Sequence, residues 1–333
     1  MKKWLEDMRS ASVKKAIPVL SFPAIQLMNI SVKDLISNSD TQAKGMKMVA
    51  DAVDSGASVS LMDLSVEAEC FGATIRYSDD EVPTVIGSVV TSEEEANALQ
   101  IPQVGACRTK IYIEAMEKAV KLIEDRPVLA GIIGPFSLAG RLMDVTEAMV
   151  NCYTEPDMVH ILLDKVTDFL IEYAKAYKAV GANGIVMAEP LAGLLSPALA
   201  EEFSGPYVKR VVDAVQDDNF IVVYHNCGNC TIQMIDSILA TGCAAYHFGN
   251  AISMAEMMTH IPPETIAMGN VDPAAEFRNG TPQSIREATW KVMEECCKYP
   301  NFVISSGCDI PPMSKWENIH AFFAAVDEFY QKH

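Results

Sequence analysis

The chain has 333 residues, half of them hydrophobic, and a formal net charge of −18. This length suits a single α/β barrel. The acidic balance argues against nucleic acid and anionic membranes as partners, because both are bound through clustered lysines and arginines. We find no run of 18 apolar residues and no apolar segment behind Lys2 and Lys3, so we expect neither a transmembrane helix nor a signal peptide. With nine cysteines and no visible export signal, we expect reduced thiols and a cytoplasmic protein.

The first 17 residues predict an amphipathic lead-in helix, with Trp4 and Met8 on one side. Downstream, short apolar runs alternate with helical stretches. The runs predict strands over 19–23, 58–63, 128–134, 184–189, 220–224, 244–248, 265–272 and 302–306. Helices are expected over 41–55, 110–125, 155–180, 196–215, 232–240, 254–260, 281–298 and 316–331. The stretch 77–104 is rich in Asp, Glu, Pro and Ser and predicts an excursion over the surface.

Strands that alternate with helices indicate parallel pairing through crossover helices. Eight such strands predict one (β/α)8 TIM barrel of the α/β class, spanning 1–333 as a single domain with an N-terminal helical extension. An open doubly wound sheet is the alternative. No G-x-G-x-x-G follows the first predicted strand, which weakens that alternative.

Two strands of this barrel are predicted to end in metal-binding residues. His225 and Cys227 follow the fifth strand, and Cys308 follows the eighth. His225 and Cys227 are two positions apart, so on an extended segment they point to the same side. One imidazole and two thiolates suit zinc, and three protein ligands leave a fourth position for water or substrate. The pair Cys227 and Cys230 also forms a C-x-x-C, whose alternative interpretation is a redox site.

Other polar residues are expected at the same rim of the barrel. Glu189 is a candidate catalytic carboxylate, either as a fourth metal ligand or as the group that orients the metal-binding histidine. Asp309 is a second candidate catalytic residue, and Asn270 and Asp272 are candidate cofactor-binding residues. His247, within the sixth strand, is interpreted as a packed barrel residue.

Several motifs together resemble a known family. They are Asp63–Glu69 with Phe71-Gly72-Ala73, Gly134–Ser137, Glu189-Pro190, His225–Asn229, Gly269–Pro273 and Ser306–Pro311. From about residue 18 to the end, the chain resembles the uroporphyrinogen decarboxylase superfamily. It resembles most the methylcobamide:coenzyme M methyltransferase branch, which serves methanol and methylamine metabolism. In that branch one His and two Cys bind a catalytic Zn²⁺, which the resemblance transfers to His225, Cys227 and Cys308.

The resemblance also implies a reaction. Zinc would ionise a thiol such as coenzyme M, and the thiolate would take the methyl group of a methyl-Co(III) corrinoid and leave Co(I). The chain lacks an Asp-x-His-x-x-Gly corrinoid-binding motif, so a transient partner protein would carry the methylcobamide. A decarboxylase is less expected, since residues 17–33 contain no arginine to hold a porphyrinogen's carboxylates. Tetrahydrofolate as the acceptor, a non-catalytic zinc-stabilised scaffold and the oligomeric state stay open.

Overall fold

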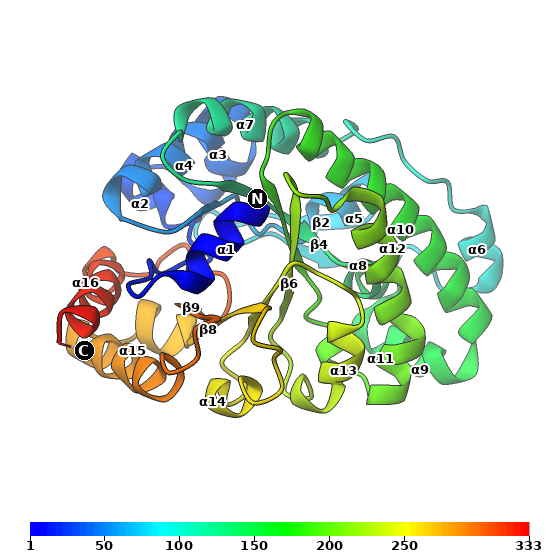
Figure 1. Cartoon of the computed structure of the whole chain (residues 1–333). Coiled ribbons are helices and arrows are strands. Elements are labelled where there is room, and N and C mark those ends of the chain that lie inside the picture. Colours follow the sequence, from blue (N-terminus) through cyan, green and yellow to red (C-terminus); the bar gives the residue numbers. More distant parts are fainter. Residues whose placement is uncertain (333) are drawn as a thin grey trace.

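A curled sheet of seven parallel strands forms the centre of the computed structural model, which describes residues 1–332 (Figure 1). Each neighbouring pair is parallel, in the order β1-β4-β5-β6-β7-β8-β9. The strands are β1 (Ser58–Val59), β4 (Val128–Ile133), β5 (Gly184–Ala188), β6 (Ile221–Asn226), β7 (Ala245–Phe248), β8 (Ile266–Val271) and β9 (Phe302–Ser306). The fold class predicted from the sequence, an α/β TIM barrel, is thereby confirmed.

Helices surround this sheet, and the longest of them borders it along one side (Figure 1). The helices before β5 are α1 (Lys2–Ser10), α2 (Ala24–Met28), α3 (Val32–Ile36), α4 (Ser39–Ala52), α5 (Val66–Cys70), α6 (Glu93–Ala98), α7 (Thr109–Leu122), α8 (Pro135–Met143), α9 (Val145–Thr154) and α10 (Pro156–Ala179). Those after it are α11 (Pro197–Phe203), α12 (Gly205–Val215), α13 (Ile235–Leu239), α14 (Met254–Met257), α15 (Pro282–Cys296) and α16 (Trp316–Lys332).

The prediction of a strand over 19–23 is wrong, because this segment makes isolated hydrogen bonds and not the regular backbone pairing of a β-sheet. The chain just before it nevertheless fills the eighth position of the barrel, between β9 and β1. Ile17 N donates to Ile304 O at 3.1 Å on one side, and Gly56 N donates to Ala16 O at 2.9 Å on the other. The barrel is therefore closed by an irregular segment, residues 16–20, which we call the closing segment.

The barrel interior is a small apolar core of inward-facing side chains. It consists of Ile17, Val19, Ala57, Val59, Met62, Leu129, Val186, Ala188, Ile221, Val223, Ala245, Ile266, Met268 and Val303. Trp4, Leu5 and Met8 of α1 pack against this core, so the predicted apolar side of the lead-in helix is where it was expected. The helix itself ends at Ser10 and not at residue 17, because Ala11 adopts an extended backbone.

Several helix boundaries also differ from the prediction. The helix expected over 196–215 is divided at Ser204 into α11 and α12, and α14 covers only four residues of the expected 254–260. The expected helix over 155–180 is present as α10, and Gly181 follows it with φ +97°, a conformation that favours glycine. Within residues 1–332 no helix is both long enough and apolar enough to span a membrane.

The stretch 77–104 is more than a surface excursion. Its first part forms β3 (Thr84–Ile86), which pairs antiparallel with β2 (Thr74–Arg76) to make a hairpin outside the barrel sheet. Its later part carries α6, in which Ala96 is fully buried. The hairpin becomes important below, because the residues at the start of β3 reach the candidate site.

Candidate metal centre and its cavity

His225, Cys227 and Cys308 meet at the carboxyl ends of β6 and β9, as the spacing predicted. Ile221 and Val223 of β6 face the barrel core, and Val222 and Tyr224 face the surrounding helices. His225 continues the inward row by alternation, and Cys227 follows it just beyond the strand. Gly249 leaves room for this turn, since a Cβ there would lie 2.5 Å from Cys227 Cα.

The three side chains are close enough to share one metal ion. Their candidate ligand atoms all lie within 4.8 Å of one another, and Cys308 Sγ is 3.5 Å from His225 Nε2. The Cys308 contact lowers the pKa of the Cys227 thiol despite its burial, and His225 adds to the effect. The same contact, together with burial, raises the pKa of Cys308. The pair therefore already favours one thiolate, the form in which cysteine binds metal.

A buried chain of hydrogen bonds orients the His225 ring. His225 Nδ1 lies 2.7 Å from His247 Nδ1, and His247 Nε2 lies 2.7 Å from Ser305 Oγ. Ser305 Oγ donates to the Ile17 carbonyl oxygen at 2.7 Å. The hydroxyl has a single proton, so it accepts from His247 Nε2–H, and His247 Nδ1 in turn accepts from His225 Nδ1–H.

This chain leaves His225 Nε2 without a proton, and Nε2 is the nitrogen that faces Cys308. Burial and the neighbouring His225 lower the pKa of His247 well below its usual range, which agrees with a neutral ring. A ligating histidine commonly has its other ring nitrogen held in this way, which fixes the tautomer and the ring plane. His247 is therefore more than a packed barrel residue.

The three candidate ligands line a cavity of about 260 Å³. Its other walls come from five regions of the chain: the closing segment, the loop after β1, the start of β3, α8, and the end of β5 with the residues after it. The lining residues are Val19, Met62, Leu64, Ser65, Val82, Pro83, Thr84, Val85, Arg141, Ala188, Pro190, His225, Cys227, Cys308 and Asp309. Most of these side chains are apolar, so the few polar groups in the cavity stand out.

Glu189 does not join the three candidate ligands. Its carboxylate is fully buried and accepts from Phe136 N at 2.9 Å, Ser137 N at 3.0 Å and Ser137 Oγ at 2.8 Å. These donors belong to the first turn of α8, where a carboxylate is favoured by the free N–H groups. Burial raises the pKa of Glu189 to about 7, although the three donors oppose this rise. The structure thus gives both oxygens of Glu189 partners away from the metal-binding residues.

The remaining predicted site residues divide into two groups. Asp309 lines the cavity beside Cys308, and its Oδ1 is buried without a hydrogen-bond partner among the described residues. Asn270 and Asp272 do not line it. Asn270 Nδ2 donates to Gly249 O and Ile252 O, and Asp272 Oδ1 accepts from the first N–H groups of the helical turn that begins at Pro273. The structure therefore places these two residues in backbone-supporting roles.

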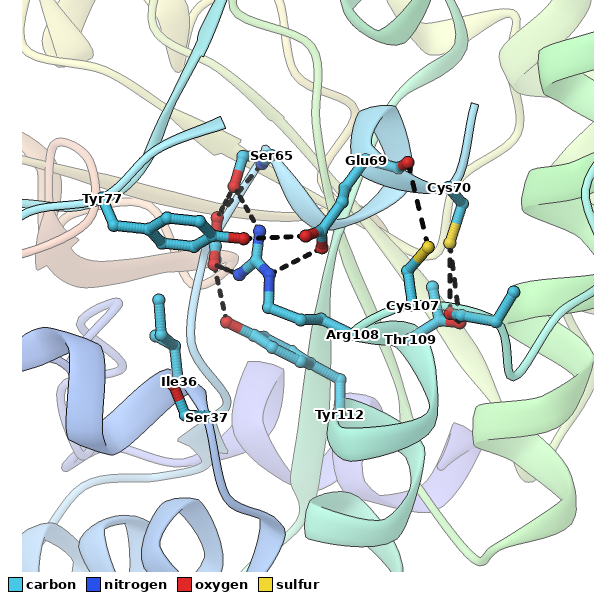
Figure 2. A network of polar contacts seen from close by, with 12 residues as sticks. Ile36, Ser37, Ser65, Glu69, Cys70, Tyr77, Cys107, Arg108, Thr109 and Tyr112 are labelled. Atoms are coloured by element: carbon cyan, nitrogen blue, oxygen red, sulfur yellow. Dashed lines mark hydrogen bonds and ion pairs between the residues drawn. The ribbon is translucent and has the colours of Figure 1, made fainter. Parts of the chain in front are cut away.

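One wall of the cavity is fixed by a buried ionic network (Figure 2). Arg108 forms ion pairs with Asp63 and Glu69, and its Nη2 donates to Ser65 Oγ at 2.8 Å. Tyr112 donates to Asp63 at 2.7 Å. The network ties the loop after β1, which contributes Leu64 and Ser65 to the cavity, to α5 and α7.

Sequence reasoning missed the cavity residues that no motif marks. Thr84, at the start of β3, was included in a surface excursion, and Arg141 was not considered as a site residue. Arg141 follows the Gly134–Ser137 motif on the same helix, and that proximity is the one signal that could have pointed to it. Helix α8 itself, in a region given no element, was also missed.

Known proteins resemble this chain in sequence and in fold. The family model described as "Uroporphyrinogen decarboxylase (URO-D)" matches residues 14–329. The chain is 31% identical over 263 residues to "Methylcobamide:CoM methyltransferase MtbA" of Methanosarcina acetivorans, covering 77% of this chain and 75% of that protein. It is 27% identical over 286 residues to "Uroporphyrinogen decarboxylase" of Coxiella burnetii, covering 82% and 77%.

A solved structure described as "methyltransferase from Methanosarcina mazei" superposes with a TM-score of 0.86 at 24% identity, covering 99% of this chain and 98% of that one. At this identity the superposition establishes the fold. The family, the branch and the class of enzyme predicted from the motifs are confirmed together: the chain belongs to the uroporphyrinogen decarboxylase family, in the branch of the methylcobamide methyltransferases.

Proposed function

We propose that this protein transfers a methyl group from a methylated corrinoid, carried by a partner protein, to a small thiol bound at a zinc site. The single observation that carries the proposal is the meeting of His225, Cys227 and Cys308 within 4.8 Å at the wall of one cavity. Relatives named as methylcobamide:CoM methyltransferases support the donor and the kind of acceptor.

The donor set fits zinc. One imidazole with an unprotonated Nε2 and two cysteines, one already favoured as thiolate, provide borderline-soft ligands. No fourth His, Cys, Asp or Glu within residues 1–332 joins the group, as expected of a site that keeps a position for substrate. A zinc ion held by these residues would keep the acceptor sulfur deprotonated at neutral pH, which makes it a nucleophile.

The other residues of the site hold the metal-binding histidine in place, make room for the acceptor and exclude water. The His225–His247–Ser305 chain holds the imidazole in one tautomer and orientation. The mostly apolar walls keep water from the sulfur, which strengthens electrostatic interactions in the cavity. A volume of about 260 Å³ accommodates a small thiol and supports it over tetrahydrofolate, which is considerably larger. A corrinoid is also too large for the cavity, so it would approach from the mouth on its carrier protein.

The test combines metal analysis with methyl transfer from methylcobalamin to a panel of thiols. His225→Ala and Cys308→Ala should each lose stoichiometric zinc and thiol methylation. Cys230→Ala is the matched control, because Cys230 follows Cys227 by three residues but lies outside the ligand group. Unchanged zinc content and rate in the first two variants would show that the site is misassigned. Normal zinc but no methylation of any thiol by the unmodified protein would favour the scaffold interpretation.

A further inference from the structure

Cys70 and Cys107 form a second pair of neighbouring thiols, outside the candidate metal centre. Cys70 is the last residue of α5, and Cys107 precedes α7 by two positions. Cys70 Sγ lies 3.2 Å from Ala106 O, and Cys107 Sγ lies 4.0 Å from Glu69 O. Each thiol therefore contacts the carbonyl group of the residue before the other cysteine. The two thiols also interact directly, and Figure 2 shows their sulfur atoms beside each other.

An ion pair holds the backbone on both sides of this pair. Arg108, the residue after Cys107, donates through Nε to the carboxylate of Glu69, the residue before Cys70, at 2.7 Å. The two cysteines are therefore kept close together, so a bond between their sulfur atoms needs little movement of the chain. The contacts that each thiol would lose are weak, because sulfur is a poor hydrogen-bond donor.

The two thiols differ in exposure, which gives each a different role in oxidation. Cys107 is exposed to solvent, whereas Cys70 is half-buried. Burial, together with the neighbouring Cys107, raises the pKa of the Cys70 thiol to about 12, so Cys70 keeps its proton at neutral pH. The backbone of Cys107 has φ +48°, a left-handed conformation that disfavours most side chains. An accessible thiol beside a second thiol is the arrangement of redox-sensitive cysteine pairs.

The pair also lies at the base of the excursion that walls the cavity. The chain leaves the barrel region after Cys70 and returns at Cys107, and the segment between them carries β2, β3 and α6. Residues 82–85 of this segment line the cavity. Its later part is held on α10, where Lys165 Nζ donates to three carbonyl oxygens around the end of α6. A covalent bond between the two cysteines would close the segment at its base.

We propose that Cys70 and Cys107 are a redox-sensitive pair, which a peroxide converts reversibly into a disulfide that fastens the base of the excursion. The Cys107 sulfur attacks one peroxide oxygen and the O–O bond breaks, which yields a sulfenic acid and one water molecule that carries the thiol proton. The Cys70 sulfur then displaces the sulfenic hydroxyl group, which leaves as a second water molecule with the Cys70 proton. Two thiols thus lose two electrons to one peroxide, and a dithiol reductant reverses the change. This inference does not depend on the proposed function.

The first experiment maps the bond. The protein, kept in a zinc-containing buffer, is treated with hydrogen peroxide, and its peptides are then analysed without reduction. The unmodified protein should yield a link between Cys70 and Cys107 that dithiothreitol removes, and Cys107→Ser should not. Cys297→Ser is the matched control and should retain the link, because Cys297 is half-buried like Cys70 but its thiol contacts Tyr330 Oη. Absence of the link in the unmodified protein, or linkage of Cys107 mainly to another cysteine, would overturn the inference.

The second experiment measures the fastening by hydrogen exchange and thermal unfolding. Oxidation should slow amide exchange in the β2–β3 hairpin, residues 74–86, because its base can no longer separate. The Tm should rise by about 3–6 °C, since the cross-link closes a loop of 38 residues, counted from 70 to 107 inclusive, in the unfolded chain. Oxidised Cys107→Ser should show neither change, and Cys70→Ser provides the same comparison from the other partner. A disulfide that alters neither the exchange nor the Tm would overturn its role at the base of the excursion.

Discussion

Replacing Ser305 with alanine should weaken zinc binding although Ser305 is not a ligand. The Ser305 side chain is fully buried. Its hydroxyl accepts from His247 Nε2 and donates to Ile17 O, both at 2.7 Å. Without it, the His247 Nε2–H group would be left unpaired, which costs about 1–3 kcal/mol. The ring can avoid this cost by moving its proton to Nδ1, but Nδ1 faces His225.

That proton shift would conflict with metal binding. If His247 Nδ1 carries the proton, it becomes the donor of the hydrogen bond to His225 Nδ1, and His225 Nδ1 must then be the unprotonated acceptor. The His225 proton would therefore move to Nε2, the nitrogen expected to bind zinc. Metal binding then has to reverse an unfavourable tautomer. Loss of such an outer partner typically reduces metal affinity 10- to 100-fold, equivalent to about 1.4–2.8 kcal/mol.

The assay is an equilibrium competition for zinc against a chromogenic chelator, with thermal unfolding of the zinc-free protein measured in parallel. Ser306→Ala is the matched control. Ser306 is the adjacent residue of β9 and is equally buried, but its Oγ accepts from Val19 N at 3.0 Å in the closing segment and not from a histidine ring. Both variants should lose similar stability, but only Ser305→Ala should lose zinc affinity. Equal zinc affinities for the two variants would refute the role assigned to the hydrogen-bond chain.

Three further predictions concern carboxylates. Glu189→Gln should retain stoichiometric zinc but lower the Tm and raise KM for the acceptor. The reason is that the Gln side chain has one oxygen, so it cannot accept from Phe136 N and Ser137 N as the two carboxylate oxygens do. Loss of zinc, measured by elemental analysis, would instead support Glu189 as a ligand. Burial raises the pKa of Glu67 to about 8. The folded protein therefore holds this proton above the unfolded pKa, so the free energy of unfolding falls as pH rises from about 4.5 towards 8, by at most about 1.4 kcal/mol per unit. Glu67→Gln should remove this slope in urea titrations at pH 5.5 and 8, and an unchanged slope would contradict the assignment. Asp272→Ala should cost about 1 kcal/mol of stability, because the helical turn that begins at Pro273 loses its N-cap, but it should leave zinc content and KM unchanged. An increased KM would show that Asp272 contributes to substrate binding.

Much of the barrel could be predicted because its strands are almost entirely buried. Val128–Ile133 and Ile221–Asn226 are buried at every position, so they read as apolar runs, the first ended by Gly134 and the second by His225 and Asn226. The rule that parallel strands end on the same rim then brings together His225, Cys227 and Cys308 across about 80 residues of sequence. Period-2 alternation predicted that His225 in β6 and Cys227 just beyond it point to the same side, and their ligand atoms do lie within 4.8 Å of each other.

The cavity walls could not be predicted in this way. Thr84 and Arg141 lie in segments that carry no ligand motif of their own, and only tertiary packing places them at the site. Glu189 was expected at the rim and is there, but its partners come from α8, an element that the sequence interpretation did not include. A carboxylate at a strand end has several possible partners, and the sequence does not show which helix N-terminus will approach it.

The most instructive error, the missing first strand, is connected with the hydrogen-bond chain that orients His225. In a regular ladder the closing segment would exchange backbone bonds with β9. Here one backbone bond, from Ile17 N to Ile304 O, joins the two, and two serine side chains of β9 supply the rest: Ser306 Oγ accepts from Val19 N, and Ser305 Oγ donates to Ile17 O. The second of these bonds leaves the Ser305 hydroxyl with a single possible role towards His247, that of acceptor. The irregular backbone that prevents a strand therefore also fixes the direction of every hydrogen bond up to His225, and with it the nitrogen that is available to a metal.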